Sequence, residues 1–415
     1  REEQGDVRSV HGRVPSLPSL RTVRPFRQRM SSLLLTIFVP TFGEGGMERM
    51  LVNMANGLAR AGLRVDFWVG REDGPFLDRL DPAVRLLRHP RTSTRRRTAA
   101  FAGYLAERRP DVVLAAKDPA VLVALEARRL SGAPCAVVAR PGSVSQRLQR
   151  RPALLRWRDL RVMRRAYRGA DLVVANSEGL ARDVEAVSGI PLASIPVVRN
   201  PVVTPDLDAL GSGPPGHPWL ETGQPPVVLG VGAFRRGKDF ETLIRAFALA
   251  RATRPLRLVL LGRGRREEAL RRLARDLGVS SDVAFPGFLE NPYPLMRAAA
   301  VLVLSSRWEG SPNVLTEALA LGTPVVSTDC PSGPREVLQD GRVGPLVPMG
   351  DAQGMARAIL DTLAHRPDPA RLRAAVAEYS LAENARRYSE LLHRLLARVR
   401  PGSPCAAPVP TAGTP

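Results

Sequence analysis

The sequence predicts an α/β protein built from two doubly wound parallel sheets that face one another across a cleft. Three observations predict this fold class. Short apolar runs of strand length alternate with helix-length segments along the chain. The runs are continuously apolar, which is typical of parallel strands covered by helices on both faces. The chain has 415 residues and a Pro- and Gly-rich break near its middle, so two cores are expected.

The first predicted domain spans residues 32–200 and contains five candidate strands. They are Leu33–Val39, Val65–Val69, Asp111–Ala115, Ala136–Ala139 and Asp171–Ala175. A helix is predicted over Met47–Ala61, because its apolar residues recur with helical spacing. Residues 1–31 precede this domain. They are rich in Arg and Pro, lack the apolar centre of a signal peptide, and are expected to be a disordered basic extension.

The break at residues 201–226 is predicted to be a linker, and the second domain follows over residues 227–380. Its candidate strands are Val227–Val231, Leu256–Leu261, Val283–Phe285, Val301–Leu304 and Pro324–Ser327, and its helices include Phe240–Ala252 and Glu267–Leu277. An amphipathic helix over 381–400 is expected to pack back on the first domain. The Pro- and Ala-rich tail, residues 401–415, is expected to be disordered.

The charge of the chain favours anionic partners. The formal net charge is +21, and of the 61 basic residues 59 are Arg and only two, Lys117 and Lys238, are Lys. Nucleotides, phospholipid surfaces and nucleic acid all fit that charge. We expect no specific nucleic-acid binding, because the charge is spread widely and no recognised binding motif is present. The Arg bias is typical of a GC-rich genome, so the two retained lysines are candidates for a specific role.

Cysteines, histidines and apolar runs exclude several classes of protein. The three cysteines and five histidines do not cluster, so neither a disulfide framework nor a metal site is expected. No apolar run approaches the roughly 20 residues of a membrane span. We therefore expect a cytoplasmic protein that needs no metal cofactor.

A glycine-containing loop follows the first strand of each half. Gly45 and Gly46 lie where the first strand leads into the first helix, a place where backbone N–H groups can face an anion. In the second half, Gly230–Phe240 carries Arg235, Arg236 and Lys238. A dinucleotide fingerprint would need glycine at position 235, so a Rossmann dehydrogenase is rejected. What remains is a cationic loop at a sheet edge, where Arg235 and Lys238 could neutralise a diphosphate leaving group.

Two carboxylates, Glu309 and Glu317, lie eight positions apart directly after the apolar strand Val301–Leu304. The carboxyl ends of strands are where open α/β sheets bind ligands. Pro312 between them favours a helix start, whose free N–H groups can receive a polar ligand. Acidic residues also favour helix starts for structural reasons alone, but that does not explain the Gly-Ser-Pro turn and the Gly-Thr-Pro strand entry beside them.

These motifs together resemble the retaining glycosyltransferases of family 4. The resemblance rests on Glu309–Glu317, Gly322–Val326, Gly45–Glu48 and Asp171–Ser177, and it covers about residues 33–395. Thr328–Glu336 is similar to a branch that builds bacterial surface polysaccharides and lipopolysaccharide core. The family implies a GT-B fold, in which two Rossmann-like domains face across a cleft. It also implies that the C-terminal domain binds the donor and the N-terminal domain binds the acceptor.

The resemblance also implies roles for individual residues. Lys238 matches the lysine on the donor diphosphate, Glu309 the glutamate near the donor sugar, and Glu317 the ribose-binding glutamate. Gly45 and Gly46 match the loop that faces the diphosphate, and Phe288 the wall around the base. The remaining residues of the expected donor site are Gly264, Gly310, Ser311, Asn313 and Leu315, and Arg235 is expected to join Lys238 in catalysis.

Two departures from the family pattern affect these expectations. Ala233 stands where an arginine is usual, so Arg235 or Arg236 would have to replace it. No histidine occurs near Asp111–Pro119 or Ala139–Gly142, where Lys117 and Arg140 stand instead. A nucleotide-sugar 2-epimerase of the same architecture and a non-catalytic sugar-nucleotide-binding relative are the alternatives.

The expected reaction moves a hexose or N-acetylhexosamine from a nucleotide diphosphate, UDP favoured, to a lipid-linked or saccharide acceptor with retention. The segment Arg147–Arg168 is strongly basic, and Trp157, Leu160, Met163 and Tyr167 would form one stripe of a helix there. We therefore expect peripheral association with an anionic membrane surface. The alternative is that this stripe packs in the core and the arginines are ordinary surface.

Overall fold

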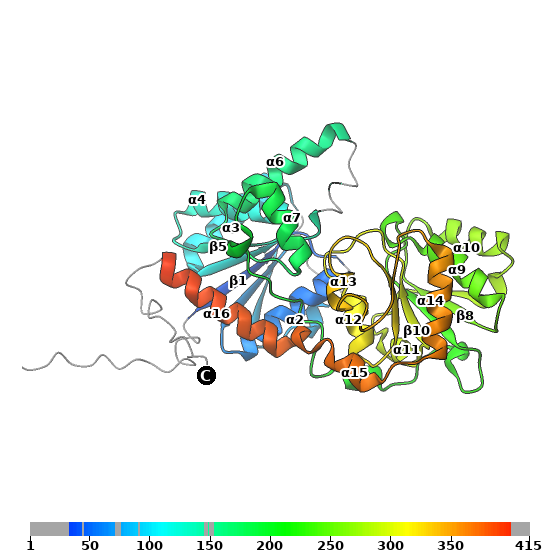
Figure 1. Ribbon diagram of the computed structural model, residues 1–415. Helices are drawn as coiled ribbons and strands as arrows, with labels where there is room; N and C mark the ends of the chain where they lie inside the picture. Colours follow the sequence, from blue (N-terminus) through cyan, green and yellow to red (C-terminus); the bar gives the residue numbers. More distant parts are fainter. Residues whose placement is uncertain are drawn as a thin grey trace, which may run out of the picture.

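A computed structural model describes residues 33–43, 45–70, 76–89, 92–144, 148 and 153–399. The extension and the tail predicted to be disordered, residues 1–31 and 401–415, lie outside these residues. Two six-stranded parallel sheets lie side by side, each covered by helices on both faces (Figure 1). The predicted fold class is confirmed.

The first sheet has the strand order β3-β2-β1-β4-β5-β6. Its strands are β1 (Leu34–Val39), β2 (Arg64–Val69), β3 (Val84–Arg88), β4 (Val112–Ala116), β5 (Ala136–Arg140) and β6 (Leu172–Val173). Its helices are α2 (Gly46–Arg60), α3 (Thr94–Arg108), α4 (Asp118–Ser131), α6 (Ala153–Gly169) and α7 (Glu178–Ser188). The sequence did not predict β3, because two of the five residues of this edge strand are arginines and the strand is only partly buried.

The second sheet repeats this arrangement, with the order β12-β11-β10-β7-β8-β9. Its strands are β7 (Val227–Val231), β8 (Arg257–Leu261), β9 (Val283–Gly287), β10 (Val301–Leu304), β11 (Val325–Thr328) and β12 (Leu346–Val347). Its helices are α9 (Phe240–Arg251), α10 (Glu267–Asp276), α11 (Tyr293–Ala298), α12 (Asn313–Ala320), α13 (Pro334–Val337), α14 (Ala352–Ala364) and α15 (Pro369–Ala374). A short helix, α8 (Leu207–Gly211), lies in the connection between the halves.

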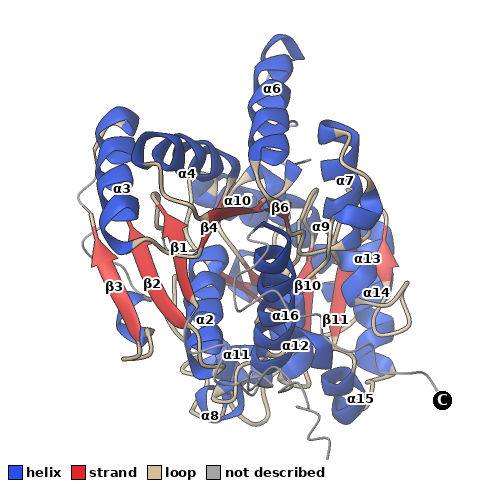
Figure 2. Cartoon of the chain, turned by 90° about the vertical axis from the view of Figure 1, so that its left-hand side faces the viewer, coloured by secondary structure: helices blue, strands red, loops and turns tan. Residues whose placement is uncertain are grey.

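The last helix, α16 (Leu381–Val399), returns to the first sheet and packs beside α2 (Figures 1 and 2). Tyr388, Leu392 and Leu396 belong to the same hydrophobic cluster as β1 and α2. Each fully buried side chain of this size contributes roughly 1.5–3 kcal/mol. The chain therefore crosses between the halves twice, which ties them together on the side of α16.

Helix α6 protrudes from the first half (Figure 2). Met163 and Tyr167 are fully buried, and Leu160 packs against the same core. Most of the apolar stripe predicted for this helix is therefore core, while Trp157 is 56% exposed. Of the segment Arg147–Arg168, residue 147 and residues 149–152 lie outside the described residues.

Candidate functional site

A cavity of about 410 Å³ lies between the two halves, at the carboxyl ends of both sheets. The first half contributes the glycine-rich turn at the start of α2, together with Arg49 and Phe76. The second half contributes loops after β7, β8 and β9, which include Gly232, Arg235, Arg263 and Phe288. The structure therefore brings the two loops singled out in the sequence, around Gly45–Gly46 and Arg235, to opposite walls of one cavity.

Lys238 and Glu309 form an ion pair at the edge of the second sheet. The Lys238 ammonium donates to Glu309 Oε1 at 2.6 Å, and Ser306 Oγ donates to the same oxygen at 2.7 Å. The side chains are 28% and 13% exposed. A Cβ on Gly232 would come within 3.2 Å of Lys238 Cε, so the glycine leaves the lysine chain room to reach the carboxylate. Two of the three predicted catalytic residues, Lys238 and Glu309, are thus neighbours in space.

Cys330 lies beside this pair and is only 3% exposed. Burial raises the pKa of its thiol to about 12, and the Glu309 carboxylate acts in the same direction. Because the thiolate is the reactive form, native protein at pH 8 should leave Cys330 unalkylated by iodoacetamide while urea-unfolded protein reacts. Peptide mass spectrometry distinguishes the two. Rapid alkylation of the native protein would mean that the loop after β11 opens.

Glu317 lies one turn into α12 and is 3% exposed. Its Oε1 forms an ion pair with Arg49 of α2 and accepts from the Tyr293 hydroxyl at 3.5 Å. Burial raises the pKa of the Glu317 carboxyl, and the Arg49 guanidinium opposes that shift. Arg49 also lies over the Tyr293 ring, 5.2 Å from its centroid. This predicted ribose-binding carboxylate therefore joins the two halves.

Asn313, the first residue of α12, makes a second connection between the halves. Its amide donates to the Gly46 carbonyl at 3.1 Å, and its Oδ1 accepts from Asn200 at 2.7 Å. Asn200 in turn accepts from the buried Arg140, whose Nε donates to the Tyr388 hydroxyl at 3.0 Å. This chain of hydrogen bonds runs from the cavity wall to α16 and positions the glycine turn relative to α12.

Lys117 and Arg140 stand where the family resemblance led us to look for a histidine. Arg140 is 3% exposed and takes part in the network just described. Lys117 donates to Glu48 Oε1 at 2.9 Å, and its backbone φ is positive, at 74°. Glu48 is buried under the glycine turn, where its Oε2 would lie 3.1 Å from a Cβ on Gly45. Lys117 and Arg140 therefore hydrogen-bond to residues that position the walls of the cavity.

The other predicted residues are distributed unevenly. Gly264 lines an adjoining cavity. Gly310 and Ser311 lie in the turn before α12, and a Cβ on Gly310 would lie 3.8 Å from the Asn176 amide nitrogen of the other half. Leu315 is fully buried in the core, and its N–H donates to the Pro312 carbonyl. The structure therefore does not bring the Leu315 side chain to the cavity.

The residues of this region that sequence reasoning missed include Arg49, Phe76, Arg263 and Asn176. Asn176 is 8% exposed, and its side-chain oxygen has no hydrogen-bond partner within the described part of the chain. A buried polar atom of this kind is costly unless a ligand or water satisfies it. Its position in the motif Asp171–Ser177 was a signal, but Arg49 could not be told apart from 58 other arginines.

Two family models match the chain. The model described as Glycosyltransferase Family 4 matches residues 44–205, and the one described as Glycosyl transferases group 1 matches residues 225–365. Together they cover both halves and the cavity between them. The chain belongs to glycosyltransferase family 4.

Two curated relatives of this family 4 chain are named as sugar transferases. The lipopolysaccharide core biosynthesis glycosyltransferase LpsE of Rhizobium meliloti is 38% identical over 193 residues, which is 46% of this chain and 54% of LpsE. A Campylobacter jejuni N-acetylgalactosaminyltransferase, named for a diacetylbacillosaminyl-diphospho-undecaprenol acceptor, is 33% identical over 46% of this chain and 51% of its own. The match thus spans about half the length of these relatives.

Solved structures show that this family 4 chain has the GT-B fold. Alr3699/HepE of Anabaena, solved with UDP and glucose, superposes with a TM-score of 0.71 and 20% identity. The superposition covers 87% of this chain and 100% of that one. The fold implied by the sequence resemblance is therefore confirmed.

Proposed function

We propose that this chain transfers a hexose or N-acetylhexosamine from a nucleoside-diphosphate sugar, with UDP-sugars favoured, to a saccharide or lipid-linked acceptor during bacterial surface glycan synthesis. The observation that carries the proposal is the convergence of the Gly45–Gly46 turn and the Arg235 loop on one cavity, with the Lys238–Glu309 pair at 2.6 Å on the same sheet edge. The names of the relatives support the pathway, and the UDP bound by a structural neighbour supports the nucleotide.

We propose one orientation of the nucleotide in the cavity. Phe288, directly after β9, and Phe76 of the first half both line the cavity, and apolar rings of this kind suit a base. Glu317 would accept hydrogen bonds from ribose hydroxyls, since no described residue donates to its Oε2. Arg235 and the backbone N–H groups at Gly45 and Gly46 would face the diphosphate.

Catalysis would rest on stabilising the leaving group. The bond between the anomeric carbon and the β-phosphate oxygen breaks, and negative charge develops on that phosphate. Lys238 and Arg235 stabilise this charge, and preorganised donors of this kind contribute roughly 3–4 kcal/mol each. The acceptor hydroxyl attacks the same face, its proton passes to the departing phosphate oxygen, and the configuration is retained. Glu309 positions Lys238 and contacts the sugar hydroxyls.

The donor proposal is tested by thermal unfolding with UDP-, GDP- and ADP-sugars, followed by release of the free nucleotide. We expect UDP-sugars to raise the unfolding temperature most, because ligands that bind the folded state stabilise it. Release of UDP that depends on an added saccharide acceptor would support transfer. If no nucleotide shifts the unfolding temperature, the proposed function is wrong.

We propose that the reaction needs no metal, because side chains and N–H groups supply the positive charge at the diphosphate. Incubation with EDTA, followed by removal of the chelator, should leave the rate of UDP release unchanged within twofold. A loss of activity that Mg²⁺ or Mn²⁺ restores would contradict this. Free UDP added to the detection step, with and without the same EDTA treatment, controls for effects of the chelator on the assay.

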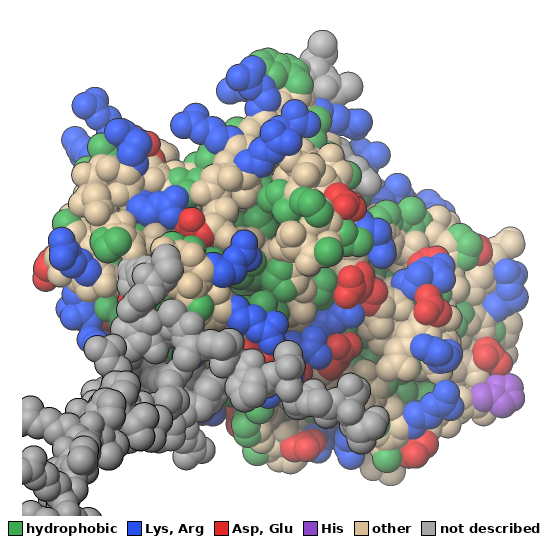
Figure 3. Space-filling view, turned by 60° about the vertical axis from the view of Figure 1, so that its left-hand side comes forward, with side chains coloured by type: hydrophobic (Ala, Val, Ile, Leu, Met, Phe, Trp, Pro, Cys, Tyr) green, Lys and Arg blue, Asp and Glu red, His purple; other side chains and the backbone are tan. Residues whose placement is uncertain are grey.

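We also propose that α6 contacts an anionic membrane surface. The described part of the chain contains no helix that is both long and apolar enough to span a bilayer. Arg158, Arg161 and Arg165 are exposed along α6, and Figure 3 shows basic side chains over the protruding top of the molecule. Co-sedimentation should rise with the phosphatidylglycerol content of vesicles and fall with salt. Binding that does not depend on the phosphatidylglycerol content of the vesicles would contradict the proposed membrane contact.

A further inference from the structure

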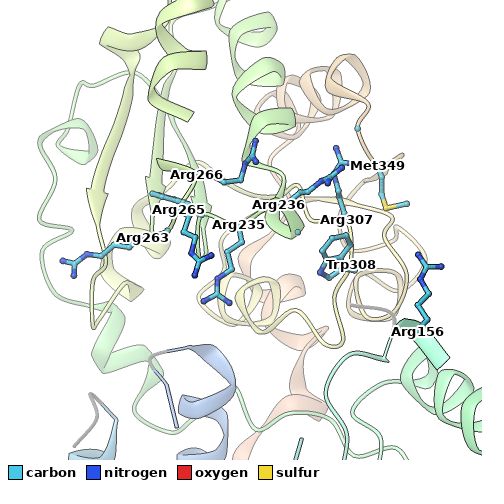
Figure 4. Close-up of a pocket in the computed structure, with 13 residues that line it drawn as sticks. Arg156, Arg235, Arg236, Arg263, Arg265, Arg266, Arg307, Trp308 and Met349 are labelled. Carbon is cyan, nitrogen blue, oxygen red and sulfur yellow. The ribbon is translucent and has the colours of Figure 1, made fainter. Parts of the chain in front are cut away.

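A second and larger cavity, of about 1240 Å³, adjoins the proposed donor site. It lies over the loops after β7, β8 and β10, and the start of α6 closes one end of it (Figure 4). Arg235 and Arg263 line both cavities. A group bound in the larger cavity would therefore lie next to the donor diphosphate.

Arginine dominates the lining of this cavity, which we call the arginine cavity. Seven of its thirteen lining residues are Arg and none is acidic, whereas the whole chain has 59 Arg in 415 residues. The seven are Arg156, Arg235, Arg236, Arg263, Arg265, Arg266 and Arg307. The Arg content of the chain alone does not explain this concentration.

Most of these cations lack a counter-charge. Arg307 pairs with Asp239 at 2.9 Å, and Arg266 pairs with Glu241. For the other five, the described residues provide no carboxylate within salt-bridge distance. Like charges gathered on low-dielectric walls repel one another and create a strong positive potential. A bound anion would relieve that repulsion.

Apolar side chains also line the arginine cavity. Trp308 packs against Gly237, where a Cβ would lie 2.7 Å from the indole. Met349, 49% exposed, lies beside it. In Figure 4 Arg156 reaches from α6 toward Trp308 and Met349, while Arg263 and Arg265 lie at the opposite end. The ligand would thus meet guanidinium groups from both halves around one aromatic surface.

We propose that the arginine cavity binds a phosphate or diphosphate group carried by the acceptor. Guanidinium groups bind phosphate oxygens in pairs and are weakly hydrated, and the Trp308 face suits the ring or chain attached to the phosphate. The inference rests on the proposed function, since the shared Arg235 and Arg263 place this anion beside the donor. The phosphate could be that of a lipid-linked diphosphate or of a phosphorylated saccharide.

The test measures binding of inorganic pyrophosphate to the full chain by calorimetry, with UDP present at saturation so that the donor site is filled. We expect pyrophosphate still to bind, and the double variant Arg156→Glu, Arg265→Glu to weaken that binding at least tenfold. The matched control is Arg245→Glu, Arg272→Glu, which changes the net charge equally at exposed positions outside the arginine cavity. The control should keep pyrophosphate affinity within twofold.

Further probes identify the source of the phosphate. Tighter binding of farnesyl diphosphate than of pyrophosphate would support a lipid-linked diphosphate, and tighter binding of glucose 6-phosphate than of phosphate would support a phosphorylated saccharide. The proposal is overturned if UDP abolishes pyrophosphate binding, or if both double variants weaken it equally. It is also overturned if the variants bind pyrophosphate normally and lose only binding to phosphatidylglycerol vesicles, which would assign these arginines to a membrane surface.

These outcomes are separate from those of the proposed function. Titration of UDP alone reports on the donor site, and both double variants should keep its affinity. Wild-type protein that binds pyrophosphate but no nucleotide would refute the proposed function and leave the arginine cavity as an anion site. Protein that binds UDP but no pyrophosphate would refute only the inference.

Discussion

Replacing Lys238 by alanine should lower kcat for sugar transfer about 100- to 1,000-fold, the usual loss when one preorganised donor to a developing oxyanion is removed. Lys238 lies on the loop after β7, and its ammonium is 2.6 Å from Glu309 Oε1. The variant therefore loses both the proposed phosphate contact and the partner that positions Glu309. UDP release under saturating donor and acceptor measures the effect.

The fold should survive this change. The Lys238 side chain is 28% exposed and Ser306 still donates to Glu309, so we expect the unfolding temperature to move by only a few degrees. Arg272→Ala, on the outer surface of α10, serves as the control for both measurements. Turnover within threefold of wild type in a folded Lys238→Ala protein would show that the arginines alone neutralise the diphosphate.

The sequence predicted the central strands of each sheet more reliably than the edges. β1, β4, β7 and β10 are buried on both faces. Burial on both faces requires continuous apolar runs, and such runs can be recognised in the amino-acid sequence. β3 and β12 lie at the outer edges of their sheets. Each of these strands has a neighbour on one side only, so the strand can be short or contain arginines. Neither strand then shows the continuous apolar run by which a buried strand is recognised.

The same limit applies to the site. Lys238 and Glu309 were found because one is a rare residue type and the other lies in a recognisable turn. Their contact, across 71 positions, depends on the neighbouring places of β7 and β10 in the sheet. The partner of Glu317 lies 268 positions away in the other half. No local pattern distinguishes Arg49 from other arginines, since only the packing of the two halves selects it.

Changing Glu317 to leucine should destabilise the protein by about 3–5 kcal/mol, the usual cost of removing one partner from a buried ion pair. Arg49 would remain as an unpaired charge with a side chain only 14% exposed. Chemical unfolding monitored by circular dichroism measures the loss. UDP affinity should fall as well, because the variant lacks the proposed acceptor for the ribose hydroxyls.

A second variant separates these two effects. Arg49→Met combined with Glu317→Leu replaces the pair by apolar side chains of similar size, a change that is often neutral for stability. We expect the double variant to regain most of the lost stability, yet to bind UDP at least tenfold more weakly than wild type. Recovery of both properties would show that Glu317 only joins the halves. Recovery of stability alone assigns the Arg49–Glu317 pair two roles, because the side chains that join the two halves would then also bind the nucleotide.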